Sequence, residues 1–238
     1  MKKSQVNSRI IIGISGASGS IYGVRILEAL RNVNKSLVQS SVVSMLSPVP
    51  FSVIQVADTG IQGKRNIDSS VTRWNDTKLG YETHLVISRA GKTTLAHEVA
   101  ERLEDITSLA DFYYSEEKIG EKIASGSFET LGMIIATCSI KTMSEIASGV
   151  TSNLLTRAAD VTLKERRKLV LMVRESPLHL GHLRNMLKLT EMGTIIAPPM
   201  PAFYIKPKSL EGIINRSIDK VLSLFDIKLP GFKEWQGV

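Results

Sequence analysis

Glycines and serines cluster immediately after the first apolar run of the chain. Ile10-Ile11-Ile12 leads into Gly13-Ile14-Ser15-Gly16-Ala17-Ser18-Gly19, and an amphipathic segment follows from Ile21. A strand, a glycine turn and a helix in this order suit phosphate binding, because glycines admit an anion close to the backbone and the first helix amides face it. The spacing is neither the dinucleotide fingerprint nor a Walker loop, so it favours a mononucleotide over NAD or ATP. The alternative is a tight connection without a ligand.

A second polar turn follows the apolar run Met133–Thr137. Cys138-Ser139-Ile140-Lys141-Thr142 places two hydroxyls, a lysine and several amides at the start of the next helix. This pattern indicates a second anion-binding turn, although Ser139 and Thr142 could serve only as helix caps. We interpret Cys138 as a small buried side chain rather than a nucleophile, because no neighbouring histidine would activate it.

The third apolar run ends in Val173-Arg174-Glu175-Ser176-Pro177. Arg174 could hold a phosphate or a flavin-like carbonyl, while Glu175 faces a reacting centre as an acid or base. The alternative is a surface ion pair of small energetic value. His179 and His182 lack a third ligand, so we expect them to cap or pack against a helix and expect no metal site.

A proline-rich loop follows the last apolar run. Ala197-Pro198-Pro199-Met200-Pro201-Ala202-Phe203-Tyr204 contains three prolines, which restrict the backbone and fix the aromatic pair. This rigidity is typical of a preformed pocket wall. A simple edge-closing loop would leave Phe203 and Tyr204 unexplained.

Apolar runs rich in β-branched residues alternate with helical periodicity along most of the chain. The alternation predicts an α/β fold of three layers, a parallel sheet with helices on both faces. Ligands in such sheets bind beyond the carboxyl ends of the strands, where the four turns fall. The predicted strands are Arg9–Ile14, His84–Ser88, Met133–Thr137, Leu169–Val173 and Thr194–Ala197. The predicted helices are Ser20–Arg31, Arg89–Leu103, Glu116–Ser125, Lys141–Gly149, Asn153–Arg167, Leu178–Met192 and Ser209–Phe225.

The 238 residues suit a single domain. The formal net charge is +7, but Lys and Arg are spread along the chain without interleaved aromatic residues, so we expect no nucleic-acid partner. The one cysteine excludes an intramolecular disulfide. No apolar run reaches the length of a membrane span and the first residues do not resemble a signal peptide, so we expect a cytoplasmic protein.

One segment breaks the alternation. Asn34–Gly80 is rich in Ser, Val and Thr and shows no sustained helical period. A strand–helix–strand unit does not require such a length, so we expect an atypical insertion at about 34–80, either ordered or mobile. Within it, Phe51–Ala57 could form an edge strand or a hairpin arm.

Six segments together resemble the UbiX family of flavin prenyltransferases. They are GISGASGSIYGVRILEAL, THLVISRA, GSFETLGMIIATCSIKT, NLLTRAADVTLKERRKLVL, VRESPLHLGHLRNMLKL and EMGTIIAPPMPAFY, in family order. The resemblance implies a three-layer flavodoxin-like or Rossmann-like fold. It also implies a homo-oligomer, with a dodecamer as one form, that binds reduced FMN and dimethylallyl phosphate. It further implies that the prenyl group is joined to the flavin at N5 and C6, which gives prenylated FMN for UbiD-type decarboxylases.

The resemblance also implies roles for residues at matching positions. The implied FMN contacts are Gly16, Ala17, Ser18, Ser88, Ser139, Ile140, Lys141, Thr142 and Arg174. The implied contacts of the prenyl donor are Tyr204 and Lys220, with Arg157 and Lys164 as further phosphate ligands that can reach a neighbouring subunit, and Trp235 closing over the prenyl group. Glu175 and Glu98 are candidate proton carriers, and Ser18 could relay a proton.

The reaction fits these residue types, because cations and amides stabilise a departing phosphate and an aromatic wall stabilises positive charge on the allyl group. Two other functions remain open. A flavin-dependent cysteine decarboxylase would need a Pro-x-Met-Asn loop, whereas this chain has Pro199-Met200-Pro201-Ala202. A non-catalytic accessory subunit of a decarboxylase would bind FMN without modifying it. We expect the insertion to project from the sheet edge, and a C-terminal tail at about 227–238 to carry Trp235.

Overall fold

The protein is described here from a computed structural model, which covers residues 8–46 and 80–230. Six parallel strands form one sheet in the order β3-β2-β1-β4-β5-β6. Their bounds are β1 Ser8–Ile14, β2 Tyr81–Ile87, β3 Phe112–Ser115, β4 Gly132–Cys138, β5 Lys168–Val173 and β6 Ile195–Ile196. The five predicted strands and their parallel direction are confirmed. The edge strand β3 was missed, because its Phe112 and Tyr113 remain exposed and give no buried apolar run.

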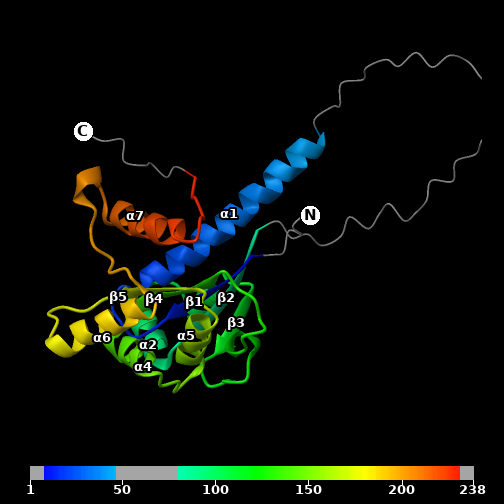
Figure 1. The fold of residues 1–238 in the computed structure, drawn as a ribbon. Helices are drawn as coiled ribbons and strands as arrows, with labels where there is room; N and C mark the ends of the chain where they lie inside the picture. Colours follow the sequence, from blue (N-terminus) through cyan, green and yellow to red (C-terminus); the bar gives the residue numbers. More distant parts are fainter. Residues whose placement is uncertain (1–7, 47–79, 231–238) are drawn as a thin grey trace, which may run out of the picture.

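Helices cover both faces of this sheet (Figure 1). They are α1 Ile21–Leu46, α2 Arg89–Glu98, α3 Leu103–Thr107, α4 Ile140–Ser148, α5 Leu154–Lys164, α6 Leu180–Glu191 and α7 Leu210–Ser223, with 3-10 turns η2 Lys122–Ala124 and η3 Phe203–Ile205. One core cluster joins α1 and α7 to the sheet, and a second joins α4, α5 and α6 to its other face. The predicted three-layer α/β fold is therefore confirmed. No helix among the described residues is long and apolar enough to cross a membrane.

The strand order creates a crevice between β1 and β4. These two strands are neighbours, yet the chain leaves β1 toward β2 and leaves β4 toward β5, in opposite directions across the sheet. At such a switch point the loops at the carboxyl ends diverge and leave room for a ligand. The glycine turn after β1 and the polar turn after β4 both lie there.

Three predicted helices differ from the structure. The helix predicted at Glu116–Ser125 is wrong: this segment forms turns and only the 3-10 turn Lys122–Ala124. The helix predicted at Arg89–Leu103 ends at Glu98, and a separate α3 begins at Leu103. The first helix continues to Leu46 instead of ending near Arg31, since the chain offers no glycine or proline between Asn32 and Leu46 to stop it.

We predicted no helix in Asn34–Gly80. This prediction is wrong for residues 34–46, which belong to α1. The side chain of Asn34 instead pairs with the backbone of Tyr81 at the start of β2. Its Nδ2 donates to the carbonyl of Tyr81, and its Oδ1 accepts from the backbone amide of Tyr81, each at 2.8 Å. These two bonds place the two ends of residues 35–80 side by side. The expected strand or hairpin arm at Phe51–Ala57 lies outside the described residues, and the insertion stays a prediction.

Candidate functional site

Side-chain hydroxyls tie the turn after β1 to the turn after β4. Ser15 Oγ donates to the carbonyl of Thr137 at 2.9 Å and accepts from the amide of Ser139 at 2.7 Å. Thr137 Oγ1 donates to the carbonyl of Ala17 at 2.8 Å. Ser15 and Thr137 are fully buried. The chain therefore uses these hydroxyls to hold the two turns as one unit at the switch point.

A carboxylate of the chain itself occupies the first amides of α1. Glu98 Oε2, at the end of α2, accepts from the amide of Gly19 at 2.8 Å and from the amide and hydroxyl of Ser20, both at 2.9 Å. Burial by itself raises the pKa of Glu98, but hydrogen bonds from Ser18, Ser20 and Gly19 outweigh burial and lower that pKa. Glu98 is therefore ionised at neutral pH. We interpreted the N-terminus of α1 as open to an external anion. This is wrong for the amides of Gly19 and Ser20, because both already donate hydrogen bonds to Glu98.

A pocket of about 560 Å³, called here the strand-end pocket, opens beside this unit at the carboxyl ends of the strands. It is lined by Gly16, Ser88, Arg89, Ala90, Glu116, Glu117, Ile119, Ser139, Lys141, Thr142, Glu145, Ser152 and Asn153. Five residues predicted to contact FMN therefore share one pocket: Gly16, Ser88, Ser139, Lys141 and Thr142. They come from three loops that are far apart in sequence, and the parallel sheet brings them together.

Two helices begin at the strand-end pocket. Ser88 Oγ accepts from the amide of Gly91 at 3.0 Å and caps α2, while Ser139 Oγ accepts from the amide of Thr142 at 3.3 Å and caps α4. The capping role of Ser139 is thus confirmed, and it leaves the amides of Ile140 and Lys141 in the first turn of α4 for a ligand. In α2 the first amide, that of Arg89, already donates to Glu116. The positive ends of two helix dipoles favour an anion here. Lys141 pairs with Glu145 at 3.8 Å, and Glu116 and Glu117 also line the pocket, so the attraction comes from the helix ends rather than from a net positive charge.

Gly16 lets two loops meet at the pocket. A Cβ atom on Gly16 would lie 2.5 Å from the Cβ of Ala90 in α2, closer than two carbon atoms can pack. Any larger residue would push the turn after β1 away from α2. The glycine is required for this close approach, which brings the amides of the turn to the wall of the pocket.

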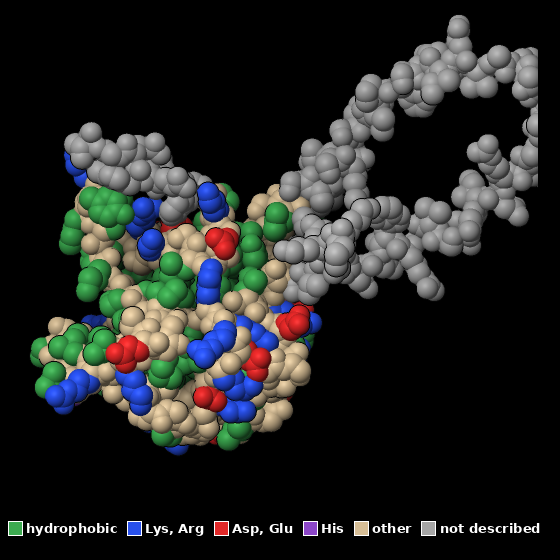
Figure 2. Space-filling view, viewed as in Figure 1, with side chains coloured by type: hydrophobic (Ala, Val, Ile, Leu, Met, Phe, Trp, Pro, Cys, Tyr) green, Lys and Arg blue, Asp and Glu red, His purple; other side chains and the backbone are tan. Residues whose placement is uncertain are grey.

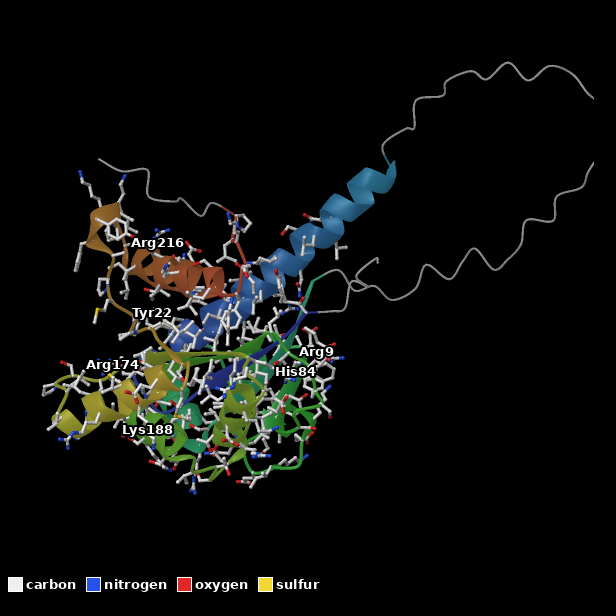
Figure 3. All side chains as sticks on the ribbon, in the orientation of Figure 1. Arg9, Tyr22, His84, Arg174, Lys188 and Arg216 are labelled. Atoms are coloured by element: carbon white, nitrogen blue, oxygen red, sulfur yellow. The ribbon has the colours of Figure 1, made fainter. Side chains whose placement is uncertain are left out.

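Arg174 and Glu175 follow β5 at the same edge of the sheet. The Arg174 amide donates to the carbonyl of Cys138 at 3.2 Å, which places it beside the end of β4, and both side chains are exposed. A carboxylate oxygen of Glu175 accepts from the amide of Ser176 at 3.0 Å. Figure 3 shows Arg174 at the opposite end of the molecule from Arg9 and His84. Arg174 and Glu175 therefore lie next to the polar turn after β4, which contains Ser139.

Cys138 and His179 take the structural roles expected of them. Cys138 is completely buried, and burial raises the pKa of its thiol, so it does not supply a thiolate. His179 Nδ1 accepts from the amides of Gly181 at 3.0 Å and His182 at 3.4 Å and caps α6. Among the described residues, no group of three or more His, Cys, Asp or Glu side chains could hold a metal ion.

A second pocket of about 190 Å³, called here the proline-loop pocket, lies between the loop after β6 and α7. It brings together Tyr204 and Lys220, the two predicted donor contacts. Its remaining lining residues are Met172, Ala197, Pro198, Pro199, Met200, Ala202, Arg216, Ser217 and Val221. The proline-rich loop forms a pocket wall, and an apolar surface with two cations at one side suits a short hydrocarbon that carries a phosphate.

The single chain leaves several predicted residues outside these pockets. Ala17, Ser18 and Ile140 are sequence neighbours of residues that line the strand-end pocket but do not line it themselves, and Arg174 lines neither pocket. Arg157 pairs with Asp160 at 2.9 Å on α5, and Lys164 pairs with Glu165. Neither cation lines either pocket, so the prediction that they reach a neighbouring subunit remains a prediction. Trp235 lies outside the described residues.

Sequence reasoning missed other residues of both pockets. Glu116 accepts from the amide of Arg89 at the start of α2, and both line the strand-end pocket. Arg89 directly follows Ser88, so the same motif could have predicted that Arg89 lies at the pocket. Glu116 lies in a loop that we predicted to be helical, and no signal pointed to it. Arg216 lies one helical turn before Lys220, and this spacing could have identified it.

Comparison with known proteins agrees with this geometry. A model of the flavoprotein family matches residues 1–224. The flavin prenyltransferase UbiX of Escherichia coli K12 is 45% identical over 231 residues, which covers 96% of this chain and 98% of that protein. The UbiX of Thauera aromatica is 44% identical over 229 residues, which covers 96% and 94% of the two chains. The chain belongs to the UbiX family of flavin prenyltransferases.

Solved structures of UbiX proteins share the fold. A crystal structure of AnUbiX in complex with FMN and dimethylallyl pyrophosphate has a TM-score of 0.77 and 34% identity, and it covers 98% of this chain and 100% of that one. A dodecameric FMN-dependent UbiX-like decarboxylase from Escherichia coli O157:H7 has a TM-score of 0.74 and 36% identity, with 97% and 100% covered. The cysteine decarboxylase SpaF, at 12% identity and a TM-score of 0.52, shares the fold alone.

Proposed function

We propose that this chain transfers the dimethylallyl group of a dimethylallyl phosphate ester to N5 and C6 of reduced FMN. One observation carries the proposal: a polar, amide-rich pocket and an apolar pocket with cations both adjoin the carboxyl edge of one sheet. The first suits the phosphate and ribityl chain of a mononucleotide, and the second suits a five-carbon phosphate ester. Bound reduced FMN would supply the nucleophile.

The residues of the chain divide the remaining work. Lys220 and the Tyr204 hydroxyl hold the phosphate and stabilise its charge as it leaves, since positioned charges act strongly at a site that excludes water. Met172 and Pro198 offer the allyl group an apolar wall. Glu175, exposed beside the turn after β4, exchanges a proton with the reacting centre. Ser18 touches Glu98, so any proton relay through Ser18 ends at an ionised carboxylate.

The neighbouring subunit forms part of this proposal. Leu180, Leu183 and Leu187 are 60%, 48% and 60% exposed along α6, and Phe203 is 72% exposed in η3. Figure 2 shows hydrophobic side chains gathered over these two regions. Such apolar surfaces mark contacts with other chains. We therefore expect a homo-oligomer, and we propose that Arg157 and Lys164 of one copy approach the donor of the next. Separately, the family of the chain leads us to propose that its product serves a UbiD-type decarboxylase and that it acts in the cytoplasm.

The experiment is anaerobic incubation of purified protein with reduced FMN and dimethylallyl phosphate, followed by mass spectrometry of the released flavin. The proposal predicts a flavin heavier by one five-carbon unit. Glu175→Gln should retain bound FMN and slow this conversion. Glu101→Gln, at an exposed position that lines neither pocket, is the matched control for loss of one carboxylate. Bound but unmodified flavin in the native protein would instead identify a carrier.

A further inference from the structure

Two cations of α7 face the proline-loop pocket. Arg216 and Lys220 are one helical turn apart, which puts both on the same face of the helix, and both line the pocket together with Tyr204. No Asp or Glu is among the lining residues of this pocket. The two lining cations therefore give the pocket a positive character, although Asp219, outside the lining, interacts electrostatically with Arg216.

Arg216 contacts the same side chain that we place at the donor phosphate. Its Nη2 donates to the Tyr204 hydroxyl at 3.2 Å, and its guanidinium carbon lies 6.0 Å from the centre of the Tyr204 ring. Arg216 is half-buried, whereas Lys220 is exposed. Figure 3 shows Arg216 projecting from α7. A phosphate held by Tyr204 and Lys220 would therefore lie next to the Arg216 guanidinium, and a second phosphate attached to it could reach that guanidinium.

The charge of the donor decides how many cations it needs. A monophosphate ester carries up to about two negative charges at neutral pH, and a second phosphate adds at least one more. An arginine can bind such a group through two parallel hydrogen bonds, which a lysine cannot do. Within one chain, Lys220 and Tyr204 serve the phosphate that both esters share. A half-buried arginine beside them adds the donor fork that a diphosphate requires.

We propose that Arg216 is a specificity-determining residue that lets this chain use the diphosphate ester, dimethylallyl diphosphate, as its prenyl donor. The inference rests on the proposed function and names the substrate of the same site. With either ester the allylic carbon–oxygen bond breaks, its electron pair leaves on the phosphate or diphosphate, and the new carbon–nitrogen bond is made to reduced flavin with loss of the N5 proton. No oxidant is consumed.

The test compares kcat/KM for the two esters in the native protein, Arg216→Met, Arg216→Lys and the control Arg102→Met. Arg102 is an exposed arginine paired with Asp105, and it lines neither pocket. We expect Arg216→Met to lose about tenfold or more with the diphosphate and less than about threefold with the monophosphate, and Arg216→Lys to recover part of the loss. An equal loss with both esters would mean that Arg216 only positions Tyr204, and would overturn the inference.

A binding measurement separates this inference from the proposed function. Calorimetric titration of the FMN-loaded protein with inorganic pyrophosphate and with inorganic phosphate should show tighter binding of pyrophosphate, and Arg216→Met should remove that preference. Equal binding of the two ions by the native protein would contradict the role of Arg216 even if prenylation occurs. Absence of prenylation with both esters in every variant would instead contradict the proposed function.

Discussion

The carboxylate of Glu98 closes the N-terminus of α1 through the amide of Ser20 at 2.9 Å and through the Ser20 hydroxyl at the same distance. The last residue of α2 therefore fixes the first turn of α1 and the glycine turn before it. This contact lies between two segments that are 78 positions apart in the chain. It makes Glu98 a positioning residue for the strand-end pocket.

Replacing Glu98 by glutamine should remove the charged cap. Hydrogen bonds lower the pKa of Glu98 in the folded state, so its contribution to stability is present above the unfolded pKa and is lost as the pH falls through the folded pKa. We expect Glu98→Gln to reduce the free energy of unfolding by about 0.5–1 kcal/mol at pH 7 and less at pH 3. Urea unfolding at both pH values measures this, with Glu101→Gln as control. An equal loss at both pH values would disprove the charge argument.

Gly16→Ala should separate the turn after β1 from α2. The added methyl group would meet Ala90 at 2.5 Å, so we expect a loss of about 1–3 kcal/mol in stability and at least tenfold weaker binding of FMN. Flavin fluorescence titration and thermal unfolding check the two effects. Gly120→Ala is the control, since no atom lies within 4 Å of its added Cβ. Unchanged FMN affinity in Gly16→Ala would remove the turn from the site.

His84, in β2, should make the free energy of unfolding depend on pH. Its ring is fully buried, stacks on Phe112 and bonds to Tyr114 and Glu82, each at 2.9 Å. Burial lowers the pKa of His84 from 6.5, and the cations Lys122 and Arg9 lower it further, although Glu82 opposes them. The unfolded chain then binds more protons near pH 6, so stability should fall as the pH drops below about 6.5.

Thermal unfolding between pH 5 and pH 8 tests this dependence. His84→Gln should flatten the acid limb of the curve, whereas His97→Gln, an exposed histidine of α2, should leave it unchanged. If both variants keep the native curve, another group controls the acid limb.

Removal of residues 35–80 should leave FMN binding intact. The Asn34 and Tyr81 pairing at 2.8 Å shows that the two ends of the segment already meet, so a short glycine linker can join them. A flavin titration of the shortened chain measures the effect, with circular dichroism to confirm folding. A folded variant that no longer binds FMN would show that the segment belongs to the site.

The glycine turns and β-branched runs were sufficient to predict the sheet, because a parallel strand is buried on both faces and its sequence is continuously apolar. The same reasoning missed β3, whose aromatic residues lie at an exposed edge. The predicted helix at Glu116–Ser125 was wrong because a helical period in a short polar segment does not outweigh tertiary contacts. One such contact is the bond of Glu116 to the Arg89 amide.

Local spacing also predicted Gly16, Ser139, Lys141 and Thr142 of the strand-end pocket, since these residues follow strand ends directly, and the family resemblance added Ser88. It could not reveal that Glu98 would occupy the amides of Gly19 and Ser20, because that contact depends on where α2 ends in space. Nor could it place Arg157 and Lys164, whose charges are paired with Asp160 and Glu165 of the same chain. The Glu98 contact and the positions of Arg157 and Lys164 both depend on long-range geometry, which residue types do not reveal.

The most direct test of the account is a crystal structure of the protein grown with FMN. The account predicts that the phosphate and ribityl chain lie in the strand-end pocket, in contact with Gly16, Ser88 and the first turn of α4, with the flavin ring directed toward Arg174. An empty pocket at saturating FMN, or FMN bound at any other place on the chain, would contradict it.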